Sequence, residues 1–197
     1  MGREFTQDEA DRHNALTDRA WSSVDSLILL EKSSPSSRPN WFARRKLRKA
    51  IDYFRQALDL NPDGWQAMWG IGKIYQRLGE HELSLEWFEH AHEKEPSQPD
   101  VAREAGLAAR ECGRAELGLK YCMVAVEIKP NDPGLMCNLA LAHMIAGDDT
   151  SAVRWATDAV AGDPADDICK NVLRFAQEVT KGTRSRPRKI EELLEAD

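Results

Sequence analysis

The stretch that decides the fold is residues 65–98, WQAMWGIGKIYQRLGEHELSLEWFEHAHEKEPSQ, because its pattern recurs along the chain. Proline, glycine and alanine positions repeat with one period of 34 residues. The repeating positions are Pro62, Pro96, Pro130 and Pro164, then Gly79, Gly113 and Gly147, then Ala57, Ala91, Ala125 and Ala159. Independent positions that share one period indicate copies of a single structural unit, which must stack on its neighbours to bury its apolar face.

The repeated residue types suit a pair of antiparallel helices joined by a tight turn. A glycine after helix-period apolar residues is typical of the left-handed residue that ends a helix. A proline placed after the second helix prevents that helix from continuing into the next unit. Asp63, Ser97 and Asp132 follow three of these prolines, and we expect their side chains to cap the next helix.

Within residues 65–98 the spacing resembles the tetratricopeptide repeat. The residues that carry the resemblance are Met68-x-x-Ile71-Gly72-x-x-Tyr75, then Ser84-x-x-x-Phe88, Ala91 and Pro96. Residues 99–132 and 133–166 follow the same pattern with smaller side chains at several apolar positions. The resemblance implies an all-α fold, a right-handed superhelical solenoid of antiparallel helix pairs, with about three regular repeats, a degenerate first repeat and a C-terminal capping helix.

We expect a single helical domain over residues 1–180. Its parts are a degenerate first repeat (6–64) with a loop insertion (33–40), the regular repeats 65–98, 99–132 and 133–166, and a capping helix (167–180). Thr6-x-x-Glu9 is a capping box that starts the first helix, and Pro39-Asn40 starts a second helix over 41–60.

The C-terminal part of the sequence predicts a helix and then a tail. The expected apolar face of the capping helix consists of Ile168, Val172, Leu173 and Phe175. Residues 181–197 are interpreted as a flexible basic linker followed by a short acidic, amphipathic tail.

The composition excludes several classes of protein. Lys and Arg number 27 against 33 Asp and Glu, and hydrophobic residues make up 42%, which is an ordinary globular balance. No apolar run approaches the ~20 residues that span a bilayer, and the N-terminal residues lack the apolar core of a signal peptide. The four cysteines form no CxxC pair. We therefore expect a cytoplasmic protein with reduced thiols and no membrane partner, and the acidic total disfavours nucleic acid.

The sequence predicts no catalytic function. No nucleophile motif, phosphate loop or dinucleotide fingerprint is present, and Gly70-Ile71-Gly72 lies inside a predicted helix with no strand before it. His90 and His92 are two residues apart on a helix, so their side chains point to different faces and disfavour a shared metal ion. We expect no enzyme activity, no cofactor and no metal.

Positive charge is concentrated in two segments that contain no acidic residue. Residues 33–51 carry six Lys and Arg, and residues 181–189 carry five. The simpler interpretation is a solvated helix face and a flexible tail. The alternative is contact with an acidic partner, nucleic acid or an anionic membrane.

The family resemblance implies a concave groove, lined by the first helix of each repeat, that holds a segment of another protein. Family positions carried onto this chain select Gln66, Trp69, Lys73, Gln76, Arg77, Arg103, Leu107, Arg110, Cys137, Asn138, Leu141, Met144 and Phe175. This set is basic at one end and apolar at the other, which suits an acidic peptide or an amphipathic helix. An equally weighted alternative is that part of the apolar set packs against the capping helix.

The predicted function is a non-catalytic adaptor for protein–protein interaction. Two alternatives stay open: a bacterial secretion or assembly chaperone for a specific client, and an RNA-associated helical-repeat protein that uses the basic segments. The acidic tail at 189–197 complements the predicted groove, which suggests that it docks into its own groove or that of a neighbouring molecule. The alternative, which the sequence slightly favours, is a free, solvated tail.

Overall fold

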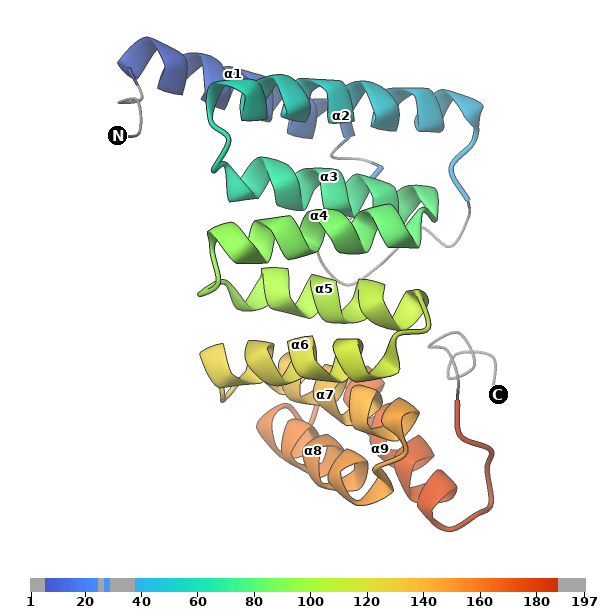
Figure 1. Cartoon of the computed structure of the whole chain (residues 1–197). Helices are drawn as coiled ribbons and strands as arrows, with labels where there is room; N and C mark the ends of the chain where they lie inside the picture. Colours follow the sequence, from blue (N-terminus) through green and yellow to red (C-terminus); the bar gives the residue numbers. More distant parts are fainter. Residues whose placement is uncertain (1–5, 25–26, 29–37, 188–197) are drawn as a thin grey trace. The chain divides into compact units, whose positions relative to one another are not determined.

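The computed structural model describes residues 6–24, 27–28 and 38–187 (Figure 1). The described residues form α-helices and no β-strand. The chain divides into two compact units, residues 1–96 and residues 97–197. The boundary falls two residues before the end of the predicted repeat 65–98, inside the single domain that the sequence predicts. The all-α, helix-pair architecture is confirmed within each unit.

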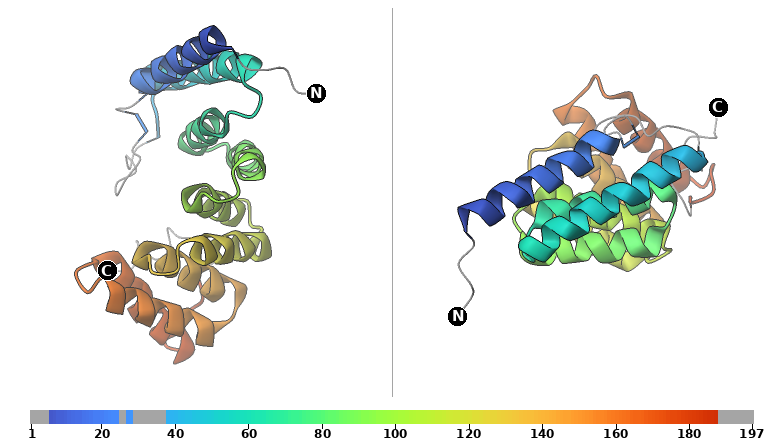
Figure 2. Two further views of the ribbon diagram at one scale, coloured as in Figure 1. Left: turned by 90° about the vertical axis from the view of Figure 1, so that its left-hand side faces the viewer. Right: turned by 90° about the horizontal axis from the view of Figure 1, so that it is seen from above.

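The first unit contains two antiparallel helix pairs, α1 with α2 and α3 with α4 (Figure 1). The helices are α1 (Gln7–Val24), α2 (Trp41–Leu60), α3 (Trp65–Leu78) and α4 (His81–Lys94). Both views of Figure 2 show α1 lying alongside α2. The second helix of the degenerate repeat was expected over 41–60, and the structure confirms these bounds.

The predicted capping box starts α1. The Glu9 backbone N–H donates to Thr6 Oγ1 at 3.3 Å, and the Thr6 backbone N–H donates to Glu9 Oε2 at 3.1 Å. These reciprocal bonds satisfy N–H groups that have no partner inside the helix. The first helix therefore begins where the sequence predicts.

Apolar side chains of α1, α2 and α3 form one core in the first unit. Phe54 of α2 is fully buried, and its ring meets Trp21 of α1 edge to face with centroids 5.1 Å apart. Ile71 and Ile74 of α3 complete the core at this level. The degenerate first repeat thus shares one apolar core with the regular repeat that follows it.

Within a pair, the helices approach closely where the repeat carries small residues. A Cβ added to Gly72 of α3 would lie 2.6 Å from Cε1 of the fully buried Phe88 on α4. Ser84 stands where the repeat pattern has alanine, and its hydroxyl donates to the Gly72 carbonyl at 3.0 Å. Because Ser84 is completely buried, this bond satisfies a hydroxyl that burial would otherwise leave unpaired.

The second unit contains two more antiparallel pairs and a capping helix. The helices are α5 (Pro99–Glu111), α6 (Ala115–Ile128), α7 (Pro133–Ala146), α8 (Asp149–Gly162) and α9 (Asp167–Thr180). The capping helix α9 packs against α7 and α8, as expected. Val172 and Phe175 are both 4% exposed, but Ile168 is 63% exposed and is not part of the buried face, contrary to the prediction.

The turns confirm the glycine predictions and correct two of the three cap predictions. Gly79, Gly113 and Gly147 have φ angles of 77°, 72° and 93°, the left-handed region that glycine favours. Asp132 caps α7 by accepting from the Leu135 N–H at 3.1 Å. The first helical residues of α3 and α5 instead follow Gly64 and Gln98, so Asp63 and Ser97 are not their caps.

The chain beyond α9 is held by two arginines of the segment expected to be a flexible linker. Arg186 donates from Nη2 to both carboxylate oxygens of Asp149 at 3.0 Å. Arg184 binds Glu178 at 3.1 Å and places its guanidinium 4.0 Å from the centre of the Phe175 ring. Arg184 and Arg186, within the segment predicted to be a flexible linker, therefore contact α9 and α8. The predicted acidic tail, 189–197, lies outside the described residues, as does most of the predicted loop insertion.

Replacing Gly72 by alanine tests how much the close approach of α3 and α4 contributes to stability. The new Cβ would crowd the buried Phe88 ring, so we expect the free energy of unfolding to fall by about 1–3 kcal/mol in urea denaturation. The control is Gly134→Ala on the exposed first turn of α7, where the added Cβ meets only the Asp132 carboxylate at 3.3 Å and stability should not fall. Equal stability of Gly72→Ala and wild type would contradict the packing argument.

Candidate partner-binding site

The predicted groove residues fall into two sets, one in each unit, and each set is described within its own unit. The set in the first unit lies on α3. Its members are Gln66, Trp69, Lys73, Gln76 and Arg77. Only Gln66 is well exposed, whereas Lys73 is 8% exposed and Arg77 donates from Nε to the Leu27 carbonyl at 3.1 Å. Lys73 and Arg77, the cations expected to attract an acidic partner to α3, thus mainly contact other residues of the first unit.

Trp69 belongs to an aromatic cluster. Its ring lies 5.6 Å from that of Trp21 on α1, centroid to centroid. Its indole Nε1 is buried and has no hydrogen-bond partner among the described residues. The side chain therefore joins α3 to α1 through its ring and leaves one donor unused.

The apolar end of the predicted groove is part of the core of the second unit. Cys137, Leu141 and Met144 of α7 are 7%, 5% and 0% exposed, and Phe175 of α9 is 4% exposed. All four belong to one apolar cluster between α7, α8 and α9. The capping helix covers the α7 positions that the family pattern assigns to ligand. These residues therefore stabilise the unit and present no apolar surface to a partner, while Leu107 on α5 is half-buried.

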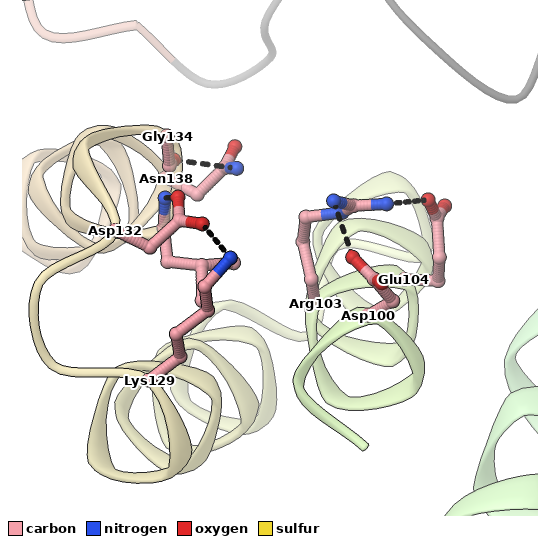
Figure 3. Close-up of polar contacts among 8 residues, drawn as sticks. Asp100, Arg103, Glu104, Lys129, Asp132, Gly134 and Asn138 are labelled. Atoms are coloured by element: carbon pink, nitrogen blue, oxygen red, sulfur yellow. Dashed lines mark hydrogen bonds and ion pairs between the residues drawn. The ribbon is translucent and has the colours of Figure 1, made fainter. Parts of the chain in front are cut away.

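Arg103 on α5 is neutralised by carboxylates of its own helix. Nη1 lies 2.7 Å from Asp100 Oδ1 and Nη2 lies 3.0 Å from Glu104 Oε1. Figure 3 shows the guanidinium held between these two side chains. Burial lowers the pKa of Arg103, but the charges of Glu104 and Asp100 outweigh burial and leave the pKa raised. The charge of Arg103 is therefore already paired with Asp100 and Glu104.

The residues opposite Arg103, around the start of α7, make a second set of internal contacts. Lys129 pairs with Asp132 at 2.8 Å, and the Asn138 side-chain amide donates to the Gly134 carbonyl at 3.0 Å (Figure 3). Asn138 is half-buried, so part of this residue reaches the surface. Of the predicted residues on α7, it is the one not enclosed by the core.

Arg110, two turns after Arg103 on α5, has a different environment. It is only 5% exposed, and its Nε and Nη2 atoms are buried with no hydrogen-bond partner among the described residues. Its Nη1 atom donates to the Asn138 backbone carbonyl at 3.5 Å, which is a long and weak hydrogen bond. A buried guanidinium without acceptors is strongly unfavourable, because the hydration that it loses is not replaced.

The groups around Arg110 do not supply the missing anion. Burial is the largest influence on Arg110 and lowers the pKa of its guanidinium, while Cys122, Glu111 and Cys137 act in the opposite direction. Burial raises the pKa of both cysteine thiols, so each is protonated and neutral near pH 7. Glu111 favours the charged form of Arg110 without accepting a hydrogen bond from Nε or Nη2.

The sequence contains a signal for this buried arginine that the groove prediction did not use. Gly118 on α6 occupies the repeat position where other copies have Ser84 and Ala152. A Cβ added to Gly118 would lie 2.6 Å from Arg110 Cγ and 3.1 Å from the Gly106 carbonyl oxygen. Glycine at this position therefore makes the space in which the arginine stem crosses from α5 toward α6.

The described residues offer no candidate metal site. No group of three or more His, Cys, Asp or Glu side chains in the described ranges is placed to hold a metal ion. No disulfide bond is present in the described part of the chain, which includes Cys112, Cys122, Cys137 and Cys169.

Comparisons with known proteins agree with this architecture. Residues 42–99 match the tetratricopeptide repeat family, and no curated protein matches the chain. The chain is similar to YrrB, a TPR protein with an unusual peptide-binding site, at 20% identity and a TM-score of 0.62, covering 72% of this chain and 73% of YrrB. It is similar to MamA from Desulfovibrio magneticus RS-1 at 14% identity and a TM-score of 0.70, covering 98% and 96%.

A third similar structure contains a ligand. It is the first TPR of Spaghetti (RPAP3) bound to the HSP90 peptide SRMEEVD, at 13% identity and a TM-score of 0.57, covering 59% of this chain and 93% of that chain. At these identities the likeness establishes the fold.

Substitution of Arg110 by methionine tests whether the buried charge is a cost to the fold. Methionine keeps the apolar stem and removes the unpaired guanidinium, so we expect the free energy of unfolding to rise by about 1–3 kcal/mol in urea denaturation. Arg103→Met is the matched control on the same helix: it removes the ion-pair partner of the buried Glu104 and should lower stability. A lower stability for Arg110→Met would mean that Arg110 is a structural residue.

Proposed function

Since this chain is a tetratricopeptide repeat protein, with a fold suited to scaffolding protein–protein interactions, we propose that its second unit binds an acidic segment of a partner protein and that Arg110 is the anchor for a carboxylate. The observation that carries the proposal is the buried guanidinium with two nitrogens that lack acceptors. A carboxylate presents two oxygens in the geometry that Arg binds best. An acidic side chain or a chain terminus therefore supplies the hydrogen-bond acceptors that Arg110 lacks.

The approach to Arg110 runs between α5 and α7. Leu107 lies one turn before Arg110 on α5, and Asn138 contacts it from α7; both are half-buried. Because Nε and Nη2 are covered, the guanidinium must swing outward on its flexible stem to meet the ligand. The stabilisation gained when the charge is paired favours that movement.

The proposed site contains fewer residues than the groove predicted from the sequence. Arg103 is already paired, and the apolar residues of α7 and α9 are buried. The ligand is therefore expected to be recognised mainly through one charge and the small exposed surface of Leu107 and Asn138. The peptide SRMEEVD held by one structural neighbour is also acidic near its end, which supports the chosen class of ligand. A cytoplasmic location stays a prediction from the sequence.

Affinity capture from cells that naturally make the protein tests the proposal. Wild type and Arg110→Met are compared, with Arg174→Met on the exposed face of α9 as a matched control. We expect a partner that wild type and Arg174→Met retain and that Arg110→Met loses, with the purified partner bound at least about tenfold more weakly. Because Arg110→Met is expected to be the more stable protein, unfolding would not explain the loss. Equal capture by all three proteins would refute a role for Arg110.

The acidic tail provides a defined ligand for a second test of the same site. A labelled peptide KIEELLEAD, which is residues 189–197, is titrated with a chain that ends at Pro187, and binding is followed by fluorescence anisotropy. We expect saturable binding that Arg110→Met abolishes and that the neutral peptide KIQQLLQAN does not show. Absence of binding would exclude the tail as a ligand and leave a segment of another protein as the partner.

A further inference from the structure

The first turn of α2 carries an exposed aromatic pair. Trp41 and Phe42 are 65% and 71% exposed, the two most exposed of the large apolar side chains in the described residues. Their rings pack edge to face, with centroids 4.9 Å apart and planes at 82°. Asn40 caps this turn by accepting from the Ala43 N–H at 2.9 Å, so the pair projects from a defined helix start.

The opposite face of α2 is buried in the core of the first unit. Leu47, Ala50, Ile51 and Phe54 point into the core of the first unit and are at most 3% exposed. The buried face of α2 therefore does not include Trp41 and Phe42, and the first unit does not need them for its core. A contiguous apolar feature of this kind on a well-packed domain marks an interaction surface.

Positive charge surrounds the pair. Residues 38–49 contain six Lys and Arg and no acidic residue, which leaves 21 Lys and Arg against 33 Asp and Glu elsewhere in the chain. Arg44 and Arg48 lie 3.9 Å and 2.8 Å from Glu80. The other four cations are exposed, and together with the aromatic pair they form what is called the Trp41 surface. Its members are Arg38, Trp41, Phe42, Arg45, Lys46 and Lys49.

Helix geometry places aromatic rings and cations on one face. Arg45 and Lys46 follow Trp41 and Phe42 by four residues each, about one turn, and the Arg45 guanidinium lies 6.0 Å from the centre of the Trp41 ring. Aromatic side chains beside Lys and Arg are the combination that seats a protein in the headgroup layer of an anionic bilayer. Each basic residue near such a surface adds attraction, and each inserted ring adds apolar burial.

We propose that the Trp41 surface is a peripheral docking site for an anionic lipid bilayer, with the Trp41–Phe42 pair inserted among the headgroups. No helix in the described ranges is long and apolar enough to cross a membrane, and the contact proposed is with one leaflet surface. This inference replaces the sequence-based expectation of no membrane partner. It is independent of the proposed peptide site, since Arg110 belongs to the other unit.

Two observations favour a bilayer over nucleic acid. Bases bind by stacking on open ring faces, but Trp41 and Phe42 are packed against each other and Arg45 lies near the Trp41 ring. In addition, the cations are confined to one short segment, whereas a nucleic acid strand needs a basic path along which its phosphates run. An edge-to-face pair within a compact cluster of cations is suited instead to insertion at a single point.

Vesicle co-sedimentation of the full chain tests the proposal. Vesicles of phosphatidylcholine alone are compared with vesicles that also contain phosphatidylglycerol, at low and high salt. We expect binding to the anionic vesicles only, weakened by salt, and reduced at least about tenfold both in Trp41→Ser/Phe42→Ser and in Arg45→Glu/Lys46→Glu. These side chains are exposed, so the melting temperature should not change.

Two control variants distinguish binding by the Trp41 surface from nonspecific binding of the protein to vesicles. Ile168→Ser removes the exposed apolar side chain of α9, and Lys170→Glu reverses an exposed charge beside it; both variants should bind vesicles like wild type. Absence of binding to anionic vesicles, or equal binding by the aromatic variant, would overturn the proposal. Binding of a labelled single-stranded RNA that the aromatic variant loses, with no vesicle binding, would assign the surface to nucleic acid instead.

Discussion

The structure depends on the close contact between the two helices of each pair. Small residues recur every 34 positions so that one helix can lie directly against the next, as Gly72 lies against the Phe88 ring in the first unit. Larger side chains at such positions would force the helices apart and expose the apolar faces that hold the unit together. Capping helix α9 extends the same principle by covering the last pair of the second unit.

The same constraint explains how a charge came to lie inside the second unit. At the repeat position where the first unit has Ser84, the second has Gly118, and the space gained accommodates the stem of Arg110. In the first unit the side chain at this position closes a hydrogen bond to Gly72. In the second, the substitution leaves a guanidinium whose Nε and Nη2 atoms have no acceptor among the described residues. One small change in a packing position thus converts a satisfied interface into a candidate site for an anion.

Local electrostatics distinguish the ion-paired arginines from the exposed cations at the start of α2. Arg103, Arg184 and Arg186 each bind carboxylates of their own unit, so their positive charge is already used. The exposed cations at the start of α2 accompany two exposed aromatic rings instead. Since an ion pair at the surface contributes little to stability, these differences matter more for recognition than for folding. Of these cations, the groove predicted from the sequence included only Arg103.

The sequence by itself determined the helix pairs, their turns and the capping helix, because these features follow from spacing along the chain. Periodic apolar residues, left-handed glycines and the Thr6–Glu9 capping box all act within a few residues of one another. Only the tertiary structure decided which groove positions are accessible. Periodicity tells which face of α7 a residue occupies, but not that α9 covers Leu141 and Met144, nor which carboxylate reaches which arginine. Those outcomes depend on distances between elements that lie far apart in the chain, and no local pattern encodes them.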